Sequence, residues 1–136
     1  MNSADLTTYI QDRVPLCGTL HIHAEKLDAD EVVLWLDWAA DLCTSNDMLH
    51  GGAVMALADS AGGAAAMANL PEGALGTSTI ESKTNFLGAI RNGQVIATSR
   101  PLHVGSSTIV IETEIRNNDK LVAKVAQIQT VLRPRN

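Results

Sequence analysis

The chain has 136 residues, of which 46% are hydrophobic and 3% aromatic, and its net charge at neutral pH is −5. This length and composition predict one folded domain over residues 1–136, and the acidic balance argues against a nucleic-acid-binding protein. Residues 1–72 have a charge balance of −9 and residues 73–136 one of +4. We therefore expect the second half to bind the charged end of any anionic ligand.

The sequence predicts a soluble protein of a reducing compartment. Cys17 and Cys43 have neither the spacing of a CxxC motif nor the number needed for a disulfide framework, which favours the cytoplasm. No basic segment followed by an apolar one opens the chain, so we expect no signal peptide. The run 48–70 is long enough for a membrane span, but a central Asp59 and many Ala and Gly residues favour a buried soluble helix.

The first 48 residues predict one short helix and two strands. Residues 4–13 have amphipathic helical spacing, and Pro15 is expected to end that helix. Residues 17–27 alternate apolar and polar side chains, which predicts a half-buried strand. Residues 31–39 are rich in β-branched and aromatic side chains and predict a second strand, and residues 40–48 predict a polar loop.

His21 and His23 fall on one face of the first predicted strand. An HxH pair on a strand can bind zinc, but no third ligand is in view. Solvent-facing histidines are the preferred interpretation, and we expect no metal site.

Residues 49–69, LHGGAVMALADSAGGAAAMAN, predict one long buried helix. His50 and the Gly51-Gly52 pair mark its beginning and Pro71 its end, which leaves about eighteen helical residues. At about 100° per residue, two opposite faces are expected. They consist of Val54, Leu57, Ala61, Ala64 and Ala68 on one side, and Gly52, Met55, Asp59, Gly63 and Ala66 on the other.

Asp59 is the only charged residue of that helix. A lone ionised carboxylate in an apolar setting costs several kcal/mol unless it is paired, hydrogen-bonded or open to a wet cavity. Two interpretations follow, a catalytic carboxylate in a cleft or an Asp bonded to a neighbouring strand or to an interface partner.

The second half predicts an antiparallel sheet. Asn117-Asn118-Asp119 and Arg91-Asn92-Gly93 are typical of turns, and Pro101 predicts a bulge or an edge position. An antiparallel sheet wrapped around the long helix, an α+β fold, hides the helix and pairs every strand. Four segments alternate with period two and are predicted as strands: 76–86, 93–104, 107–116 and 120–132.

The sequence Leu49-His50-Gly51-Gly52-Ala53, with Asp59 nine residues after the histidine, resembles hotdog-fold acyl-CoA thioesterases of the phenylacetate-degradation, or PaaI-like, branch. The stretch 82–87, Gly93, the stretch 103–105 and the closing strand 121–132 match the same pattern. The resemblance covers residues 15 to 133.

This resemblance implies a sheet of five to six strands around one central helix. It also implies dimers that join their sheets, assembled further into dimers of dimers. The implied reaction is hydrolysis of an acyl-CoA thioester to a carboxylic acid and free CoA. No cofactor is implied, because coenzyme A is part of the substrate.

The resemblance also implies roles for individual residues. Asp59 is the implied catalytic carboxylate, and a backbone N–H of Gly51 or Gly52 is the implied oxyanion donor. His50 is the histidine at the helix entry, for which we favour a positional role over that of a general base. Asn46 is the candidate for holding the attacking water or the carbonyl. The hydroxyl that assists the carboxylate is expected from the strand after the helix, with Ser78 as the main candidate beside Thr77 and Thr79.

The phosphates of CoA require cations and backbone amides. The candidates come from the positive half of the chain and from one of its turns. For substrate binding we expect Thr77, Arg91, Arg100, His103, Gly105, Ser106 and Ser107, with Lys83 and Arg116 as further cations.

Gly51 and Asp59 are eight residues apart, or about 12 Å along a helix axis, too far to act on one carbonyl carbon. The helix N-terminus can stabilise an oxyanion, while Asp59 can act as general base or as nucleophile. A thiol leaving group, with a pKa of about 8.5, departs without a strong general acid. We therefore predict a homodimer in which Asp59 of one chain faces Gly51 of the other.

Two other functions stay open at this point. A hotdog hydratase or dehydratase would need a histidine paired with an acid across a proline-containing segment, whereas Gly51-Gly52 follows His50 here. A non-catalytic acyl-CoA-binding module would share the pocket without the chemistry of Asp59. The sequence leaves the acyl group undetermined.

Overall fold

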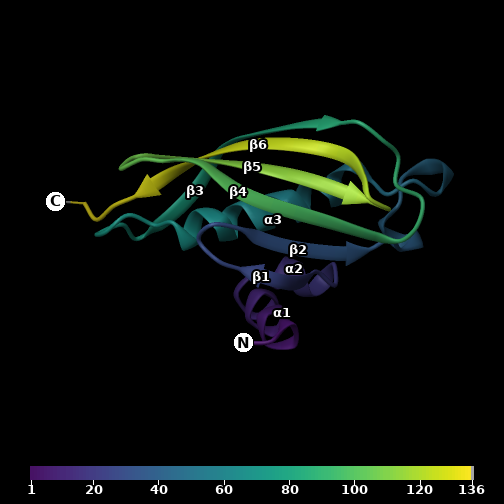
Figure 1. Cartoon of the computed structure of the whole chain (residues 1–136), viewed down its shortest axis with the longest axis horizontal. Coiled ribbons are helices and arrows are strands. Elements are labelled where there is room, and N and C mark those ends of the chain that lie inside the picture. The colour runs from purple at the N-terminus through teal and green to yellow at the C-terminus, as the bar shows by residue number, and fades with distance from the viewer. Residues whose placement is uncertain (136) are drawn as a thin grey trace.

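The computed structural model describes residues 1–135 and consists of a six-stranded antiparallel sheet that curves around one long helix (Figure 1). The strands lie in the order β1-β2-β4-β5-β6-β3. The helices are α1 (Ser3–Arg13), α2 (Pro15–Thr19) and α3 (Gly51–Ala68), and the strands are β1 (His23–Leu27), β2 (Val32–Asp37), β3 (Gly76–Phe86), β4 (Gln94–Val104), β5 (Thr108–Asn117) and β6 (Lys120–Leu132). This arrangement confirms the predicted α+β fold with a central helix.

Helix α3 packs on the inner face of the sheet, mainly against β2, β3, β4 and β5 and also against β6 (Figure 1). Its buried residues recur at helical spacing: Val54, Leu57, Ala58, Ala61, Gly62, Ala65 and Ala66. Burial does not follow the two predicted faces along the whole helix, because Ala66, on the stripe of Asp59, is fully buried and Ala68, on the opposite face, is exposed. A helix that is apolar nearly all round has no sharp hydrophobic boundary, so its pattern cannot fix the centre of the buried face.

The opposite side of α3 is open in the single chain, although the sequence predicted a buried helix. Met55 is 39% exposed and Met67 is 43% exposed, and Asp59 also reaches the surface on this side. An exposed apolar stripe beside a carboxylate is typical of a surface that another molecule covers.

The beginning of the chain differs from the prediction of a strand over 17–27. Pro15 ends α1 and also begins α2, because proline suits the first position of a helix. His21 lies in the following turn with a φ of 54°, so β1 starts only at His23. His23 stacks on Trp35 with ring centroids 4.1 Å apart. Within residues 1–135 no three His, Cys, Asp or Glu side chains gather around a common metal position.

The second half of the chain matches its prediction closely. Strand β3 pairs with β6 along its whole length, which places β3 at one edge of the sheet and β1 at the other. Asn118 and Asp119 form the predicted turn between β5 and β6, with φ angles of 51° and 63°. The register shifts between Pro101 and His103, so the predicted bulge is confirmed.

Residues 31–39 and 40–48 also follow the prediction. Strand β2 covers Val32–Asp37, and the loop after it contains two short 3₁₀ turns, Ala40–Leu42 and Ser45–Asp47. In the part of the chain that the structure describes, no helix is long and apolar enough to cross a membrane.

Candidate active site at the central helix

At the N-terminus of α3, one backbone N–H has no acceptor among the residues that the structure describes. His50 is the N-cap, and its Nδ1 accepts the N–H of Gly52 at 2.7 Å. The N–H groups of Ala53 and Val54 donate to the carbonyl of His50 at 2.9 and 3.3 Å. Within residues 1–135 the N–H of Gly51 donates to no acceptor. Of the two glycines proposed as oxyanion donor, Gly51 therefore has the available amide.

Gly51 borders a hollow of about 220 Å³, which Leu49, Val54, Phe86 and Ile90 also line. The ring of Phe86 lies beside Gly51, and a Cβ added to this glycine would be 3.2 Å from Cζ of the ring. A glycine here leaves space for a small group to approach the backbone closely.

Asp59 lies two turns further along α3 and is held through one of its two carboxylate oxygens. Its Oδ1 accepts Nε2 of Gln127 at 3.0 Å and Oγ1 of Thr79 at 3.3 Å. Its Oδ2 has no hydrogen-bond donor among residues 1–135. The carboxylate is thus fixed on the side of the sheet, while the second oxygen is available to a water or a substrate.

Two glutamines of β6 complete this network, and sequence reasoning missed both. Nε2 of Gln129 donates to Oγ1 of Thr79 at 2.6 Å, and Gln127 and Gln129 are 0% and 2% exposed. Both lie between Val125 and Val131 in the row of residues on the buried side of β6. Buried polar side chains need hydrogen-bond partners. Two glutamines at positions of β6 where the alternation predicts apolar residues are therefore the signal in the sequence that could have identified these two residues.

The hydroxyl beside Asp59 is that of Thr79, not of Ser78. Thr79 pairs with Gln129 in the sheet, whereas Ser78 pairs with Thr130 and falls on the opposite face. Thr77 shares the face of Thr79 but has no hydrogen bond to Asp59 among residues 1–135. The sequence alone made all three hydroxyl residues candidates. Only the structure shows which side chains of β3 lie on the face of the sheet that packs against α3.

Asn46 lies at the tip of the loop that leads into α3. A bridge between Cys43 and Leu49 closes this loop, and Asn46 has a φ of 62°. Its side chain has no hydrogen bond to His50 or Asp59 in the described part of the chain. The role of Asn46 in holding a water or a carbonyl stays a prediction.

A larger cavity of about 530 Å³ opens beside Asp59, between α1 and α3. Its walls include Tyr9 and Arg13 of α1, Leu27 of β1, and Gly63 and Met67 of α3. Most of these groups are apolar or small, so the carboxylate borders a space suited to an organic group.

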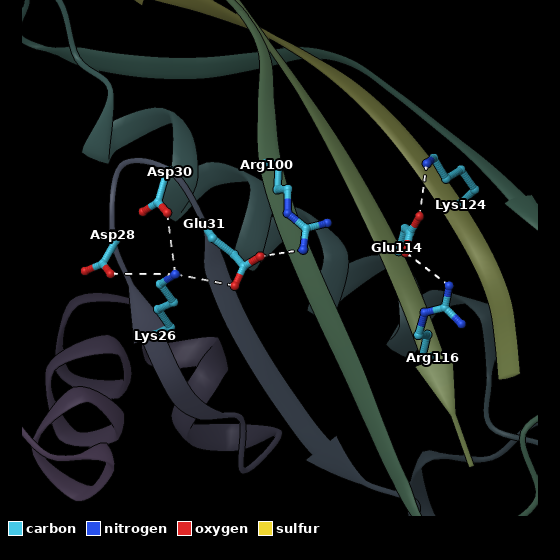
Figure 2. Close-up of polar contacts among 8 residues, drawn as sticks. All are labelled: Lys26, Asp28, Asp30, Glu31, Arg100, Glu114, Arg116 and Lys124. Carbon is cyan, nitrogen blue, oxygen red and sulfur yellow. Dashed lines mark hydrogen bonds and ion pairs between the residues drawn. The ribbon is translucent and has the colours of Figure 1, made fainter. Parts of the chain in front are cut away.

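Two of the cations expected to bind CoA, Arg100 and Arg116, are paired within the chain (Figure 2). Arg100 contacts Glu31, which also lies 3.5 Å from Nζ of Lys26. Arg116 lies 3.3 Å from Glu114, and Lys124 reaches the same carboxylate at 3.5 Å. Figure 2 shows two groups of ion pairs, in which Glu31 lies between Lys26 and Arg100, and Glu114 lies between Arg116 and Lys124.

Arg91 and the turn Gly105 to Ser107, which were also predicted to bind substrate, lie at opposite ends of the molecule. Arg91 is exposed and follows Ile90, whose carbonyl accepts the N–H of Leu49 at 2.8 Å, so Arg91 lies near the entry of α3. The turn Gly105 to Ser107 lies at the opposite end, where Arg133 donates to the carbonyl of Ser106 at 2.8 Å. His103 packs against Gly105 in this turn. One chain does not bring the two groups together.

The two cysteines are both free thiols, and burial raises the pKa of Cys17. A buried thiol with a raised pKa is a poor nucleophile, so the candidate site centres on Asp59 and Gly51 instead.

A comparison with protein families identifies this arrangement. The family model described as the thioesterase superfamily matches residues 46–124, which include the helix entry, Asp59 and Thr79. The chain belongs to the thioesterase superfamily. Its sheet around a central helix is accordingly the hotdog fold, and the membership of a hotdog-fold thioesterase family predicted from His50-Gly51-Gly52 and Asp59 is confirmed.

Individual proteins are similar over much of this thioesterase-family chain. A provisionally assigned esterase of Saccharolobus solfataricus is 30% identical over 115 residues, which cover 84% of this chain and 81% of the relative. One of Vibrio cholerae is 33% identical over 86 residues, and the match spans 63% of this chain but only 57% of that protein. The solved structure of a provisionally assigned esterase of Mycobacterium tuberculosis superposes with a TM-score of 0.85 at 27% identity, covering 90% of this chain and all of the other.

Proposed function

We propose that this member of the thioesterase superfamily hydrolyses acyl-CoA thioesters to a carboxylic acid and free CoA. The proposal rests mainly on how the carboxylate of Asp59 is held. Gln127 and Thr79 hold its Oδ1, and its Oδ2 is free beside a cavity. A carboxylate fixed in this way can direct its free oxygen at a water or at a carbonyl carbon.

The proposed site needs two chains. Gly51 and Asp59 lie on one helix, about 12 Å apart along its axis, so a single chain cannot place both at one carbonyl. Met55 lies between them on the exposed side of α3, as expected of an apolar contact surface. We therefore propose a homodimer with two sites, each combining Asp59 of one chain with Gly51 of the other, and a dimer of dimers as the full assembly.

The proposed chemistry divides the work between the two groups. The free N–H of Gly51 stabilises the negative charge that develops on the thioester oxygen, as helix N-termini do. Asp59 either takes a proton from the attacking water, or attacks the carbonyl itself, expels the CoA thiolate and forms an anhydride that water then hydrolyses to the acid and free Asp59. The CoA thiolate leaves without a strong general acid because the pKa of the CoA thiol, about 8.5, is low. His50 fixes the helix entry and does not transfer protons.

Arg91 is the cation that we propose for the CoA phosphates at the helix entry, because it is exposed and has no ion pair among residues 1–135. The turn Gly105 to Ser107 would contact CoA from another part of the dimer. We propose a cytoplasmic location, which fits the two free cysteines.

Thiol release from a panel of acyl-CoA substrates tests the proposed function. The wild-type protein is expected to release CoA, and Asp59→Asn and Asp59→Ala are expected to lose turnover while they retain the fold and the affinity for acyl-CoA. Asp37→Asn, at an exposed position of β2, is the matched control. Undiminished turnover in the Asp59 variants would exclude this site, and absence of turnover in the wild type would favour the binding-module alternative.

A further inference from the structure

The cavity beside Asp59 joins the reacting end of the proposed site to a cation. Its volume is about 530 Å³, and its lining includes both Asp59 on α3 and Arg13 on α1. Apart from Asp59, none of its lining residues is acidic. An acyl group with its carbonyl at Asp59 can therefore extend towards a positively charged wall.

Arg13 is available to an anion. Its guanidinium carbon lies 5.2 Å from the ring centroid of Tyr9, one helical turn earlier, and this contact holds the side chain against α1. Lys26, Arg100, Arg116 and Lys124 are all paired with carboxylates. Among residues 1–135 Arg13 has no such pair, and of the cations without a pair it is the one that lines this cavity.

The opposite wall of the cavity leaves space for a ligand. A Cβ added to Gly63 would meet no atom within 4 Å, and the neighbouring Ser60 and Ala64 are also small. Leu27 and Met67 supply apolar surface along the same space. These features suit a methylene chain with a polar end better than a wholly polar ligand.

We propose that the acyl group of the substrate occupies this cavity and ends in a carboxylate, which Arg13 binds. The inference rests on the proposed thioesterase function and adds a substrate class, the monothioesters of dicarboxylic acids with CoA. A guanidinium forms paired hydrogen bonds to a carboxylate, and a terminal methyl group would leave Arg13 unpartnered. Arg13 is thus inferred to determine specificity without taking part in the chemistry.

Matched substrates of equal chain length test the inference. Values of kcat/KM are measured for adipoyl-CoA against hexanoyl-CoA and for suberoyl-CoA against octanoyl-CoA, after subtraction of non-enzymatic hydrolysis. The acid-terminated member of at least one pair is expected to be preferred. Arg13→Gln is expected to lower kcat/KM for that member about tenfold or more and to change the methyl-terminated member less than twofold.

Arg13→Lys keeps the charge and is expected to retain part of the preference, and Lys120→Gln, at the exposed first residue of β6, is the charge-matched control. Equal losses for both members of a pair, or no loss in Arg13→Gln, would overturn the inference. If no substrate releases CoA, the proposed function fails. The affinities of wild type and Arg13→Gln for intact adipoyl-CoA and hexanoyl-CoA, measured by calorimetry, then decide the role of Arg13 separately.

Discussion

The Nδ1 atom of His50 accepts the backbone N–H of Gly52 at 2.7 Å. This bond uses the second amide of α3 and leaves the first, that of Gly51, without an acceptor among residues 1–135. The histidine therefore selects which backbone donor of the helix entry can reach a ligand. It does so as a cap, through the geometry of a helix N-terminus.

Replacing His50 with Ala is expected to destabilise the protein by about 1 kcal/mol, because the N-cap acceptor of α3 is lost. His50→Asn, which also caps well, should recover most of that loss. Urea unfolding at equilibrium measures both differences. An Ala variant as stable as the wild type would show that the cap contributes nothing to folding.

Replacing Gly51 with Pro deletes the proposed oxyanion donor and retains the helix. Proline suits the first helical position, and His50 already has the extended conformation required before a proline, with φ of −63° and ψ of 134°. We expect kcat to fall about 100- to 1000-fold, the usual effect of losing one such donor.

Gly51→Ala is the control for this variant, because it brings a similar Cβ towards Phe86 but keeps the N–H. Steady-state thiol release compares the two, and circular dichroism verifies that both are folded. Equal kcat in Pro and Ala variants would show that the amide of Gly51 plays no part in the reaction.

Replacing Gly62 with Ala is expected to impair the site without a change in any residue that contacts substrate. An added methyl group would overlap Oε1 of Gln127, whose Nε2 holds Asp59. Gln127 is fully buried, so it cannot move away without breaking that hydrogen bond or displacing its neighbours. We expect a loss of stability of about 1 to 3 kcal/mol, as for overpacked cores, and a lower kcat.

Gly18→Ala in α2 is the control, because a Cβ there would meet only Cβ of Gln11 at 3.9 Å, an ordinary contact, and Gly18 is not among the residues that line the cavities beside Gly51 and Asp59. Thermal unfolding and thiol release are compared in both variants. A Gly62→Ala protein with wild-type kcat would show that the Gln127 contact does not position Asp59.

Replacing Met55 with Asp places a charge on the exposed stripe between Gly51 and Asp59. If a second chain covers this stripe, the substitution buries an unpaired carboxylate, at a cost of several kcal/mol. We expect dissociation to monomers in sedimentation experiments and a parallel loss of turnover. Leu16→Asp, at an exposed position of α2, should change neither property. A fully active monomer would refute the two-chain site.

The ion pairs of Glu114 predict a pH dependence of stability. Desolvation acts to raise the pKa of Glu114, but Lys124 and Arg116 together lower it below its usual value. A lowered folded-state pKa means that the contribution to stability is present above the ordinary glutamate pKa of about 4.5 and is lost as the pH falls through the folded value.

We therefore expect Glu114→Gln to be less stable than the wild type at pH 7, by a few tenths of a kcal/mol to about 1 kcal/mol for so exposed a cluster. The difference should shrink as the pH is lowered below 4.5. Urea unfolding across this range measures it, and Glu72→Gln, which has no ion pair among residues 1–135, is the control. A difference that is independent of pH would contradict the assignment.

Local chemistry alone determined much of this protein. Glycines after His50 and Pro71 beyond the helix bounded α3 because helix ends depend on a few adjacent residues. Period-two alternation located β3 and β6 with the same limits that the structure has, since one face of each strand packs on the core. The family followed from His50-Gly51-Gly52 and the spacing to Asp59.

The remaining features depend on contacts between distant segments, which no local pattern encodes. From the sequence, Pro15 could either follow the end of one helix or begin another. In the structure it does both, because α1 ends just before it and α2 begins with it. The facing of β3 chose Thr79 over Ser78, and the approach of β6 to α3 brought Gln127, 68 residues away in the sequence, to Asp59. Sequence thus fixed where the carboxylate is, whereas only the tertiary structure decided what holds it, because hydrogen bonds between elements depend on how those elements pack.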